Sequence, residues 1–109
     1  MIEITICKRP DRKTYRSIQV SGHACSVEDG DDLVCCSVSV LTINLVNSLD
    51  HLTDDGFVFD QHESIGFMSL VFPEEPSPEA DLLLRSYELG VLSVAAQYGD
   101  WLNVNTEEV

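Results

Sequence analysis

Basic side chains are scarce in this sequence, and long apolar runs are missing. Lysine and arginine total 6 of 109 residues against 19 aspartates and glutamates, so the net charge is −13. A chain this acidic repels phosphate backbones, and direct nucleic-acid binding is not expected. No apolar run approaches the roughly 20 residues of a membrane-spanning helix, and the N-terminus lacks the long apolar region of a signal peptide. We therefore expect a single soluble, cytoplasmic domain over residues 1–109 with no membrane partner.

Cysteine pairs with the spacing of a zinc ribbon are also absent. The four cysteines are Cys7, Cys25, Cys35 and Cys36, and no two of them form a Cys-x-x-Cys pair. An even cysteine count suggests disulfides in a small secreted protein, but no export signal supports that interpretation. Metal ligation by His23, Cys25, Cys35 and a carboxylate is disfavoured, because the adjacent Cys35 and Cys36 would point about 100° apart on a helix. We expect no metal and no cofactor.

The order of apolar patterns predicts an α+β fold. Period-two alternation and β-branched residues predict four strands and a possible short final strand: 2–8, 14–20, 57–61, 65–72 and 101–105. Helical spacing of apolar residues predicts two helices, from Leu33 to about Leu52 and from Pro78 to about Gly99. The element order is therefore ββαββα, with two helices packed on a small, mostly antiparallel sheet.

The first predicted helix is apolar on two sides. Asp32 is a suitable N-cap, because its carboxylate can accept a bond from a free backbone N–H. One stripe has helical spacing: Val34, Val38, Leu41, Leu45, Leu49 and Leu52. A second apolar strip consists of Cys36, Val40 and Ile43. One side is expected to face the sheet and the other a second helix or a subunit, which would bury Cys36.

The start of this helix is a candidate site for nucleophilic chemistry. With Asp32 as N-cap, Cys35 is the third helical residue and lies near free backbone N–H groups. The positive end of the helix dipole stabilises a thiolate and lowers its pKa from about 8.5. Cys35 is also offset by one position from the stripe that begins at Val34. We therefore expect its sulfur at the rim of the core, within reach of a substrate.

A histidine is available as the proton acceptor. His23 lies twelve residues before Cys35, at the other end of a glycine-bearing loop that can bend back toward the helix. Backbone N–H groups at the helix start could stabilise an oxyanion, and Ser39, one turn beyond Cys35, could add a polar contact. His51 and His62 have no placed partner.

Structural explanations compete with this chemistry. A cysteine in an apolar helix is usually a small buried residue, and a histidine after a glycine is usually solvated. Cys25, two positions after His23, could pair oxidatively with Cys35 or have no role. A Cys35–His23 pair that acts without a metal is the more specific hypothesis, but the residue types alone leave these alternatives open.

One segment resembles a known family. The sequence SGHA at 21–24, followed by GDDLVCCSVS at 30–39, resembles the Prp family of bacterial ribosomal-processing cysteine proteases. The family pattern is Gly-His-Ala, a variable loop ending in Gly-x-Asp, an aliphatic pair, Cys, small residues and Ser. The specific motif covers residues 22–39, and the order of elements fits along nearly the whole chain.

The resemblance implies a homodimeric protease that removes the N-terminal extension of a large-subunit ribosomal protein. By motif position, Cys35 would be the nucleophile and His23 the general base, with Asp32, Ser39 and Gly22 in supporting positions. The acidic net charge suits a basic ribosomal substrate, although simple solubility also accounts for it.

The sequence departs from the family pattern at two positions, and two other function classes stay open. Cys25 stands where the family commonly has glycine, and Cys36 where it commonly has alanine or glycine. The first rival function is a non-catalytic module that binds ribosomal precursors. The second is a thiol redox-sensing domain that uses Cys25 and Cys35.

Overall fold

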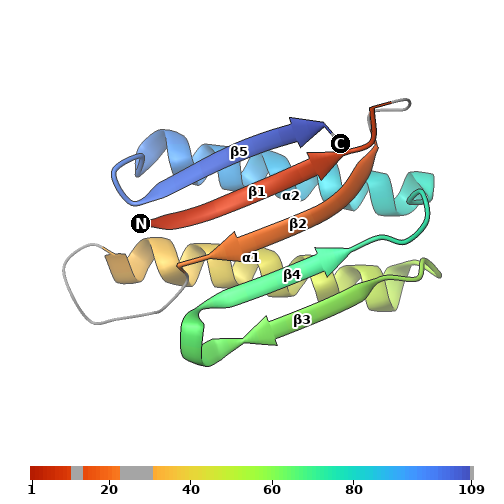
Figure 1. Cartoon of the computed structure of the whole chain (residues 1–109), viewed down its shortest axis with the longest axis horizontal. Coiled ribbons are helices and arrows are strands. Elements are labelled where there is room, and N and C mark those ends of the chain that lie inside the picture. Colours follow the sequence, from red (N-terminus) through yellow and green to blue (C-terminus); the bar gives the residue numbers. More distant parts are fainter. Residues whose placement is uncertain (11–13, 23–30, 109) are drawn as a thin grey trace.

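The chain folds into two layers, a five-stranded sheet and a pair of helices that cover one of its faces (Figure 1). This is a computed structural model that describes residues 1–10, 14–22 and 31–108. In chain order the elements are β1 (Ile2–Lys8), β2 (Tyr15–Ser21), α1 (Asp31–Leu52), β3 (Val58–His62), the short 3₁₀ helix η1 (Glu63–Ile65), β4 (Phe67–Val71), α2 (Pro78–Gln97) and β5 (Leu102–Glu108). The predicted α+β class and element order are confirmed, including the final strand.

The sheet has the order β3-β4-β2-β1-β5. Three neighbouring pairs are antiparallel, namely β1–β2, β2–β4 and β3–β4, while β5 pairs in parallel with β1. The prediction of a mostly antiparallel sheet is therefore confirmed. The final strand is longer than the predicted 101–105, because residues 106–108 continue β5 and pair with β1 up to Lys8.

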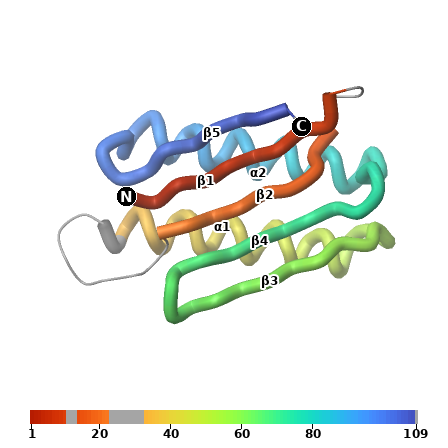
Figure 2. The backbone as a smooth tube through the Cα atoms, viewed as in Figure 1, coloured from red at the N-terminus to blue at the C-terminus, as the bar shows by residue number. Residues whose placement is uncertain are grey.

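Both helices are crossover connections, as the tube in Figure 2 shows. α1 joins β2 to the parallel strand β3, and α2 joins β4 to the parallel strand β5. β2 and β4 are antiparallel, and their two crossovers proceed toward opposite edges of the sheet. Right-handed connections then place both helices on the same face. This topology puts the start of α1 next to the end of β2.

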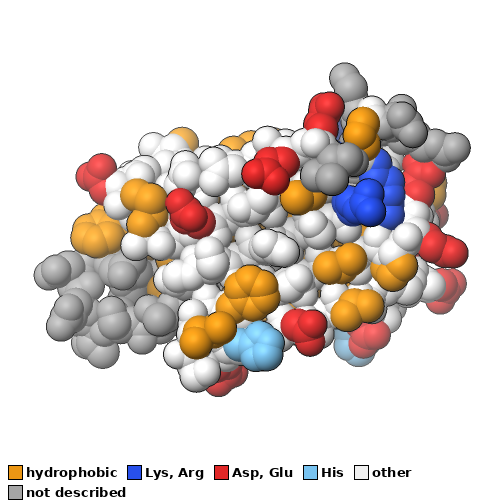
Figure 3. Space-filling view, viewed as in Figure 1, with side chains coloured by type: hydrophobic (Ala, Val, Ile, Leu, Met, Phe, Trp, Pro, Cys, Tyr) orange, Lys and Arg blue, Asp and Glu red, His pale blue; other side chains and the backbone are white. Residues whose placement is uncertain are grey.

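The core lies between the sheet and the helices. In β1 the alternating side chains Ile2, Ile4 and Ile6 point inward and are buried, which confirms the period-two prediction. Among the described residues, no helix lies on the other face of the sheet, which shows a mixture of polar and apolar side chains (Figure 3). Val58 and Val71 pair in register across β3 and β4, and both are exposed.

Two predictions for α1 differ from the structure: its first residue and the burial of its apolar stripe. α1 begins at Asp31, so Asp32 lies inside the first turn and is not the N-cap. Four residues of the predicted core stripe are buried: Val34, Val38, Leu45 and Leu49. Leu52 is 69% exposed, because the helix ends there beyond the sheet that it covers.

The second helix begins as predicted. Ser77 is the N-cap of α2, and its Oγ accepts a hydrogen bond from the backbone N–H of Ala80 at 3.2 Å. Pro78 follows at the first helical position, where its missing N–H costs nothing. Asp55 fixes this cap, since its carboxylate accepts bonds from the Ser77 N–H at 2.7 Å and from the Ser77 hydroxyl at 2.5 Å. The helix start is thereby tied to the segment after α1.

One helical segment passes the length and hydropathy test for a membrane span, contrary to the sequence expectation. Leu33–Leu52 has a mean hydropathy of 1.5 over the best window. The core helix of a soluble protein passes the same test, and α1 packs its buried stripe against the sheet and α2. The fold buries 33% of that window, so α1 packs one side on the core and leaves the rest of its surface outside it.

Candidate active site

The end of β2 requires a glycine. Gly22 has φ +76°, a left-handed backbone that side-chain-bearing residues rarely adopt. A Cβ at this position would lie 2.5 Å from the carbonyl oxygen of Met1. Met1 immediately precedes β1, so the chain leaves the sheet by passing close to the start of its neighbouring strand. This explains the glycine of the Gly-His-Ala motif by backbone geometry.

Cys35 lies near the start of α1, as predicted, but its sulfur is neither exposed nor free. The residue is 1% exposed and belongs to the core cluster with Val34 and Val38. Its position at the accessible rim of the core is therefore not observed, because the N-terminal part of α1 presents two successive residues to the interior. Cys35 is disulfide-bonded. A catalytic role for this sulfur requires the reduced form of the protein.

Cys36 is exposed, and its predicted burial is wrong. A helix turns about 100° per residue, so the rotation that buries Val34 and Cys35 directs Cys36 outward. With Val40, Leu41, Gly90 and Val94, Cys36 lines a shallow hollow of about 480 Å³ between α1 and α2. Of the second apolar strip of α1, Cys36 and Val40 lie exposed on the outer surface of the helix layer, whereas Ile43 is partly buried and packs against the core.

The remaining predicted site residues are described to different extents. Ser39 lies one turn after Cys35 on α1, is half-buried and has an interaction partner. For Asp32 the structure describes the backbone in the first turn of α1. His23 and Cys25 lie outside the described residues. The structure thus defines the glycine before His23 and the helix segment that carries Cys35.

The other two histidines are not brought to Cys35 by the helix geometry. His51 follows Cys35 by sixteen residues on the same helix, which corresponds to about 24 Å at 1.5 Å per residue. Its Nε2 lies 4.0 Å from a carboxylate oxygen of Asp50, and both side chains are exposed. His62 ends β3 and contacts the ring of Phe67, with centroids 6.2 Å apart. Neither of these contacts places a histidine against Cys35.

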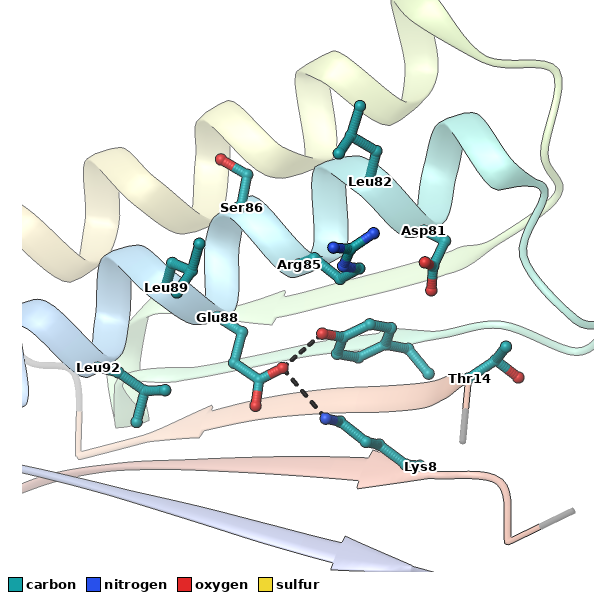
Figure 4. A pocket seen from close by; sticks show the side chains of 10 residues that line it. Lys8, Thr14, Asp81, Leu82, Arg85, Ser86, Glu88, Leu89 and Leu92 are labelled. Carbon is teal, nitrogen blue, oxygen red and sulfur yellow. Dashed lines mark hydrogen bonds and ion pairs between the residues drawn. The ribbon is translucent and has the colours of Figure 1, made fainter. Parts of the chain in front are cut away.

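A larger hollow lies elsewhere and was not predicted. It has a volume of about 690 Å³ between α2 and the turn-side ends of β1 and β2 (Figure 4). Glu88 occupies its centre: the Tyr15 hydroxyl donates a hydrogen bond to the Glu88 carboxylate, and Lys8 Nζ lies 3.2 Å from the same oxygen. Burial is the largest cause that raises the pKa of the Tyr15 hydroxyl above its ordinary value, and the hydrogen bond to Glu88 raises it further. These residues come from three separated segments, so no local sequence signal could have indicated the hollow.

Within residues 1–10, 14–22 and 31–108, no group of three or more His, Cys, Asp or Glu side chains is arranged to hold a metal ion.

Solved structures with this fold include protein-processing enzymes. A Staphylococcus aureus structure, described as an essential ribosomal processing protease Prp in complex with a substrate peptide, superposes with a TM-score of 0.92 at 21% identity, covering 98% of this chain and 100% of that one. SMU.848 from Streptococcus mutans superposes with a TM-score of 0.90 at 28% identity, covering 100% of this chain and 99% of that one. These likenesses define the class of the chain by its fold, a two-layer α+β domain shared with both structures.

The sequence itself matches a known family. A model of the family described as cysteine protease Prp matches residues 1–103. The ribosomal processing cysteine protease Prp of Bacillus subtilis is 33% identical over 110 aligned residues, which cover 97% of each chain. The chain belongs to the Prp family of cysteine proteases, as the motif at 22–39 predicted.

Proposed function

We propose that this protein removes the N-terminal extension of a large-subunit ribosomal protein in the cytoplasm, with Cys35 as nucleophile and His23 as general base. Family membership over residues 1–103 carries the proposal. The B. subtilis relative is named for ribosomal processing, and it aligns along 97% of its length. The motif at 22–39 and the position of Cys35 near the start of α1 support the assignment of the two catalytic residues. We treat residues 1–109 as a single protease domain.

The proposed reaction begins with the reduced protein. His23 accepts the proton of the Cys35 thiol, and the thiolate attacks the carbonyl carbon of the scissile peptide bond. Backbone N–H groups near the start of α1 stabilise the oxyanion that forms. His23 then donates the proton to the leaving amine, which leaves the N-terminal peptide as a thioester on Cys35. A water molecule, deprotonated by His23, hydrolyses this thioester and restores the thiol.

The supporting residues Gly22, Ser39 and Asp32 act by positioning the segments that carry the two proposed catalytic residues. Gly22 immediately precedes His23 in the sequence, and its left-handed backbone fixes the end of β2 beside Met1. Ser39 lies one helical turn after Cys35, on the same flank of α1. Asp32 lies in the first turn of α1, where a negative charge interacts favourably with the helix dipole and steadies the helix start.

Charge supports a basic substrate. The protein carries a net charge of −13, whereas proteins that bind ribosomal RNA are commonly basic. Opposite net charges accelerate encounter and make association weaken as salt concentration rises.

The outer surface of the helix layer supports the proposed homodimer. Leu33 and Val40 of α1 are 56% and 67% exposed, and Leu89 of α2 is 69% exposed. Exposed apolar side chains of this size favour burial against a second protein surface. A second copy of the chain is the occupant that the family resemblance implies.

Cleavage of a precursor peptide by cysteine variants tests the proposed function. The reduced wild-type protein should cut a peptide that spans the junction between extension and mature protein. Cys35→Ala should abolish cleavage, because it removes the sulfur that attacks the peptide bond and carries the thioester. Cys36→Ala is the matched control, since it removes the neighbouring exposed thiol, and it should retain most activity.

Circular dichroism should show that both variants are folded. Residual cleavage by folded Cys35→Ala would disprove the assignment of the nucleophile. Binding of the peptide without cleavage by any form, and without sensitivity to thiol alkylation, would favour the binding module instead.

A further inference from the structure

The hollow between α2 and the ends of β1 and β2 has no part in the proposed reaction. Its volume of about 690 Å³ lies within the range of about 300–1,000 Å³ that is typical of ligand sites. We propose that this hollow is a distal substrate site, which binds an apolar peptide segment of the precursor away from the scissile bond. The inference rests on the proposed function, because it takes the ligand from the substrate of that reaction.

The floor of the hollow is held in place by bonds within the protein. Tyr15 is 3% exposed, and its hydroxyl donates a hydrogen bond to the Glu88 carboxylate. Lys8 Nζ lies 3.2 Å from the same carboxylate oxygen and 5.1 Å from the centroid of the Tyr15 ring. Arg9 fixes the neighbouring backbone, because its guanidinium donates to the carbonyl oxygens of Tyr15 and Phe72, both at 2.8 Å. A site that is formed in advance loses little conformational entropy on binding.

The charges that line the hollow cancel. Its basic side chains are Lys8 and Arg85, and its carboxylates are Asp81 and Glu88. The sum is zero, so the hollow favours neither a cation nor an anion. Tyr15 and Lys8 both contact Glu88 Oε1, and among the described residues that Figure 4 draws, no further bond reaches Glu88 Oε2, Asp81 or the Arg85 guanidinium. The hollow therefore offers both acceptors and donors, a combination that suits the N–H and C=O of a peptide group.

An apolar wall selects the side chains of the bound segment. Leu82 and Leu92 of α2 line the hollow and are 62% and 44% exposed. Exposed leucines gain stability when another apolar side chain covers them. A wall of apolar side chains beside a few polar groups is also the usual composition of a ligand site. A segment without apolar side chains would leave this wall in water, so the peptide must carry them.

The distance from the motif glycine determines which part of the precursor can reach the hollow. Gly22, the residue before the proposed general base, lies beside Met1 at the start of β1, whereas Lys8 lies at the end of the same strand. β1 has 7 residues and rises about 3.3 Å per residue, so its ends lie roughly 23 Å apart. An extended peptide of about seven residues spans this distance. The bound segment therefore begins about seven residues from the scissile bond.

Precursor peptides of two lengths test the distal site. Reduced wild type, Leu82→Ser and the control Leu52→Ser are assayed on peptides with about four or about twelve residues on each side of the scissile bond. Leu52 is the matched control, because it is a helix leucine with 69% exposure that does not line the hollow. Leu82→Ser should raise KM for the long peptide about ten-fold with kcat unchanged, and KM for the short peptide less than about two-fold. Leu52→Ser should match wild type on both.

Changing the long peptide tests the other side of the contact. Serine in place of its apolar residues beyond about the seventh position should raise KM of wild type about ten-fold. Leu82→Ser should then add little to this rise, because two changes that remove the same contact are not additive. Additive effects of the two changes would contradict a contact between Leu82 and this part of the peptide.

The outcomes separate the distal site from the proposed function. If wild type cleaves both peptides and Leu82→Ser changes KM equally for both, or for neither, the distal site is wrong and the proposed function stands. An altered oligomeric state of Leu82→Ser by size-exclusion chromatography, with a loss on both peptides, would assign Leu82 to a subunit contact and overturn the distal site.

Binding decides the distal site even if no peptide is cleaved. Absence of cleavage by every reduced form would overturn the proposed function alone. Fluorescence anisotropy of a labelled peptide that contains only the distal segment measures binding to the hollow directly. Weaker binding to Leu82→Ser than to Leu52→Ser would support the distal site, and equal binding to the two variants would overturn it.

Discussion

The substitution Gly22→Ala probes the backbone that leads into the motif histidine. A left-handed conformation costs a residue with a Cβ about 1–2 kcal/mol, and Gly22 has φ +76°. The new Cβ would also lie 2.5 Å from the Met1 carbonyl oxygen, which is closer than van der Waals contact permits. Met1 cannot move far without disturbing Ile2, which is buried and donates its N–H to the Trp101 carbonyl at 2.9 Å.

We therefore expect Gly22→Ala to lower the free energy of unfolding by about 2–3 kcal/mol in reducing buffer. Gly56→Ala is the matched control, because it has no atom within 4 Å of the added Cβ and no positive φ. It should be neutral or stabilising by up to about 1 kcal/mol. Urea unfolding midpoints with unchanged slopes measure both changes. Equal stability of the two variants would refute the proposed role of the Gly22 backbone.

Two further predictions concern α2. Ser77→Ala removes the N-cap and the hydroxyl bond to Asp55, so it should lower the free energy of unfolding by about 1–2 kcal/mol in urea. The control Ser93→Ala removes an exposed side-chain bond to the Leu89 carbonyl and should change that free energy by less than about 0.5 kcal/mol. Similar costs for the two variants would contradict the capping argument. Burial raises the pKa of Tyr87 to about 12 from 10.0, so its contribution to stability is present below pH 10.0 and is lost as pH rises through about 12. Tyr87→Phe should flatten the loss of stability over that alkaline interval, and an unchanged slope would contradict the assignment to this residue.

Local signals were sufficient for most elements. The alternation of Ile2, Ile4 and Ile6 predicted β1 because a strand presents successive side chains to opposite faces. The helical spacing that begins at Pro78 predicted the start of α2, because helix-start signals involve only residues within the first turn. The motif at 22–39 predicted the family, since its residue types and spacing form one contiguous signal.

Predictions failed where burial depended on distant elements. Asp32 was expected to precede the first helix, but α1 begins at Asp31, because the start of a helix varies by a residue or two around its capping signals. Cys36 was expected in the core and Cys35 at its rim. The rotation of α1 on the sheet reversed this order, and hydrophobicity alone could not indicate it, since both residues are cysteines.

The sequence by itself determined the strands and helices, the family and the candidate pair Cys35 and His23, because propensity, capping and motif spacing are properties of neighbouring residues. The tertiary structure decided the sheet order β3-β4-β2-β1-β5 and the parallel pairing of β5 with β1. It also decided that Gly22 must pass the Met1 carbonyl and that Cys35 faces the core. These features depend on contacts between segments far apart in the chain, and such contacts exist only once the two crossover helices have packed on one face of the sheet.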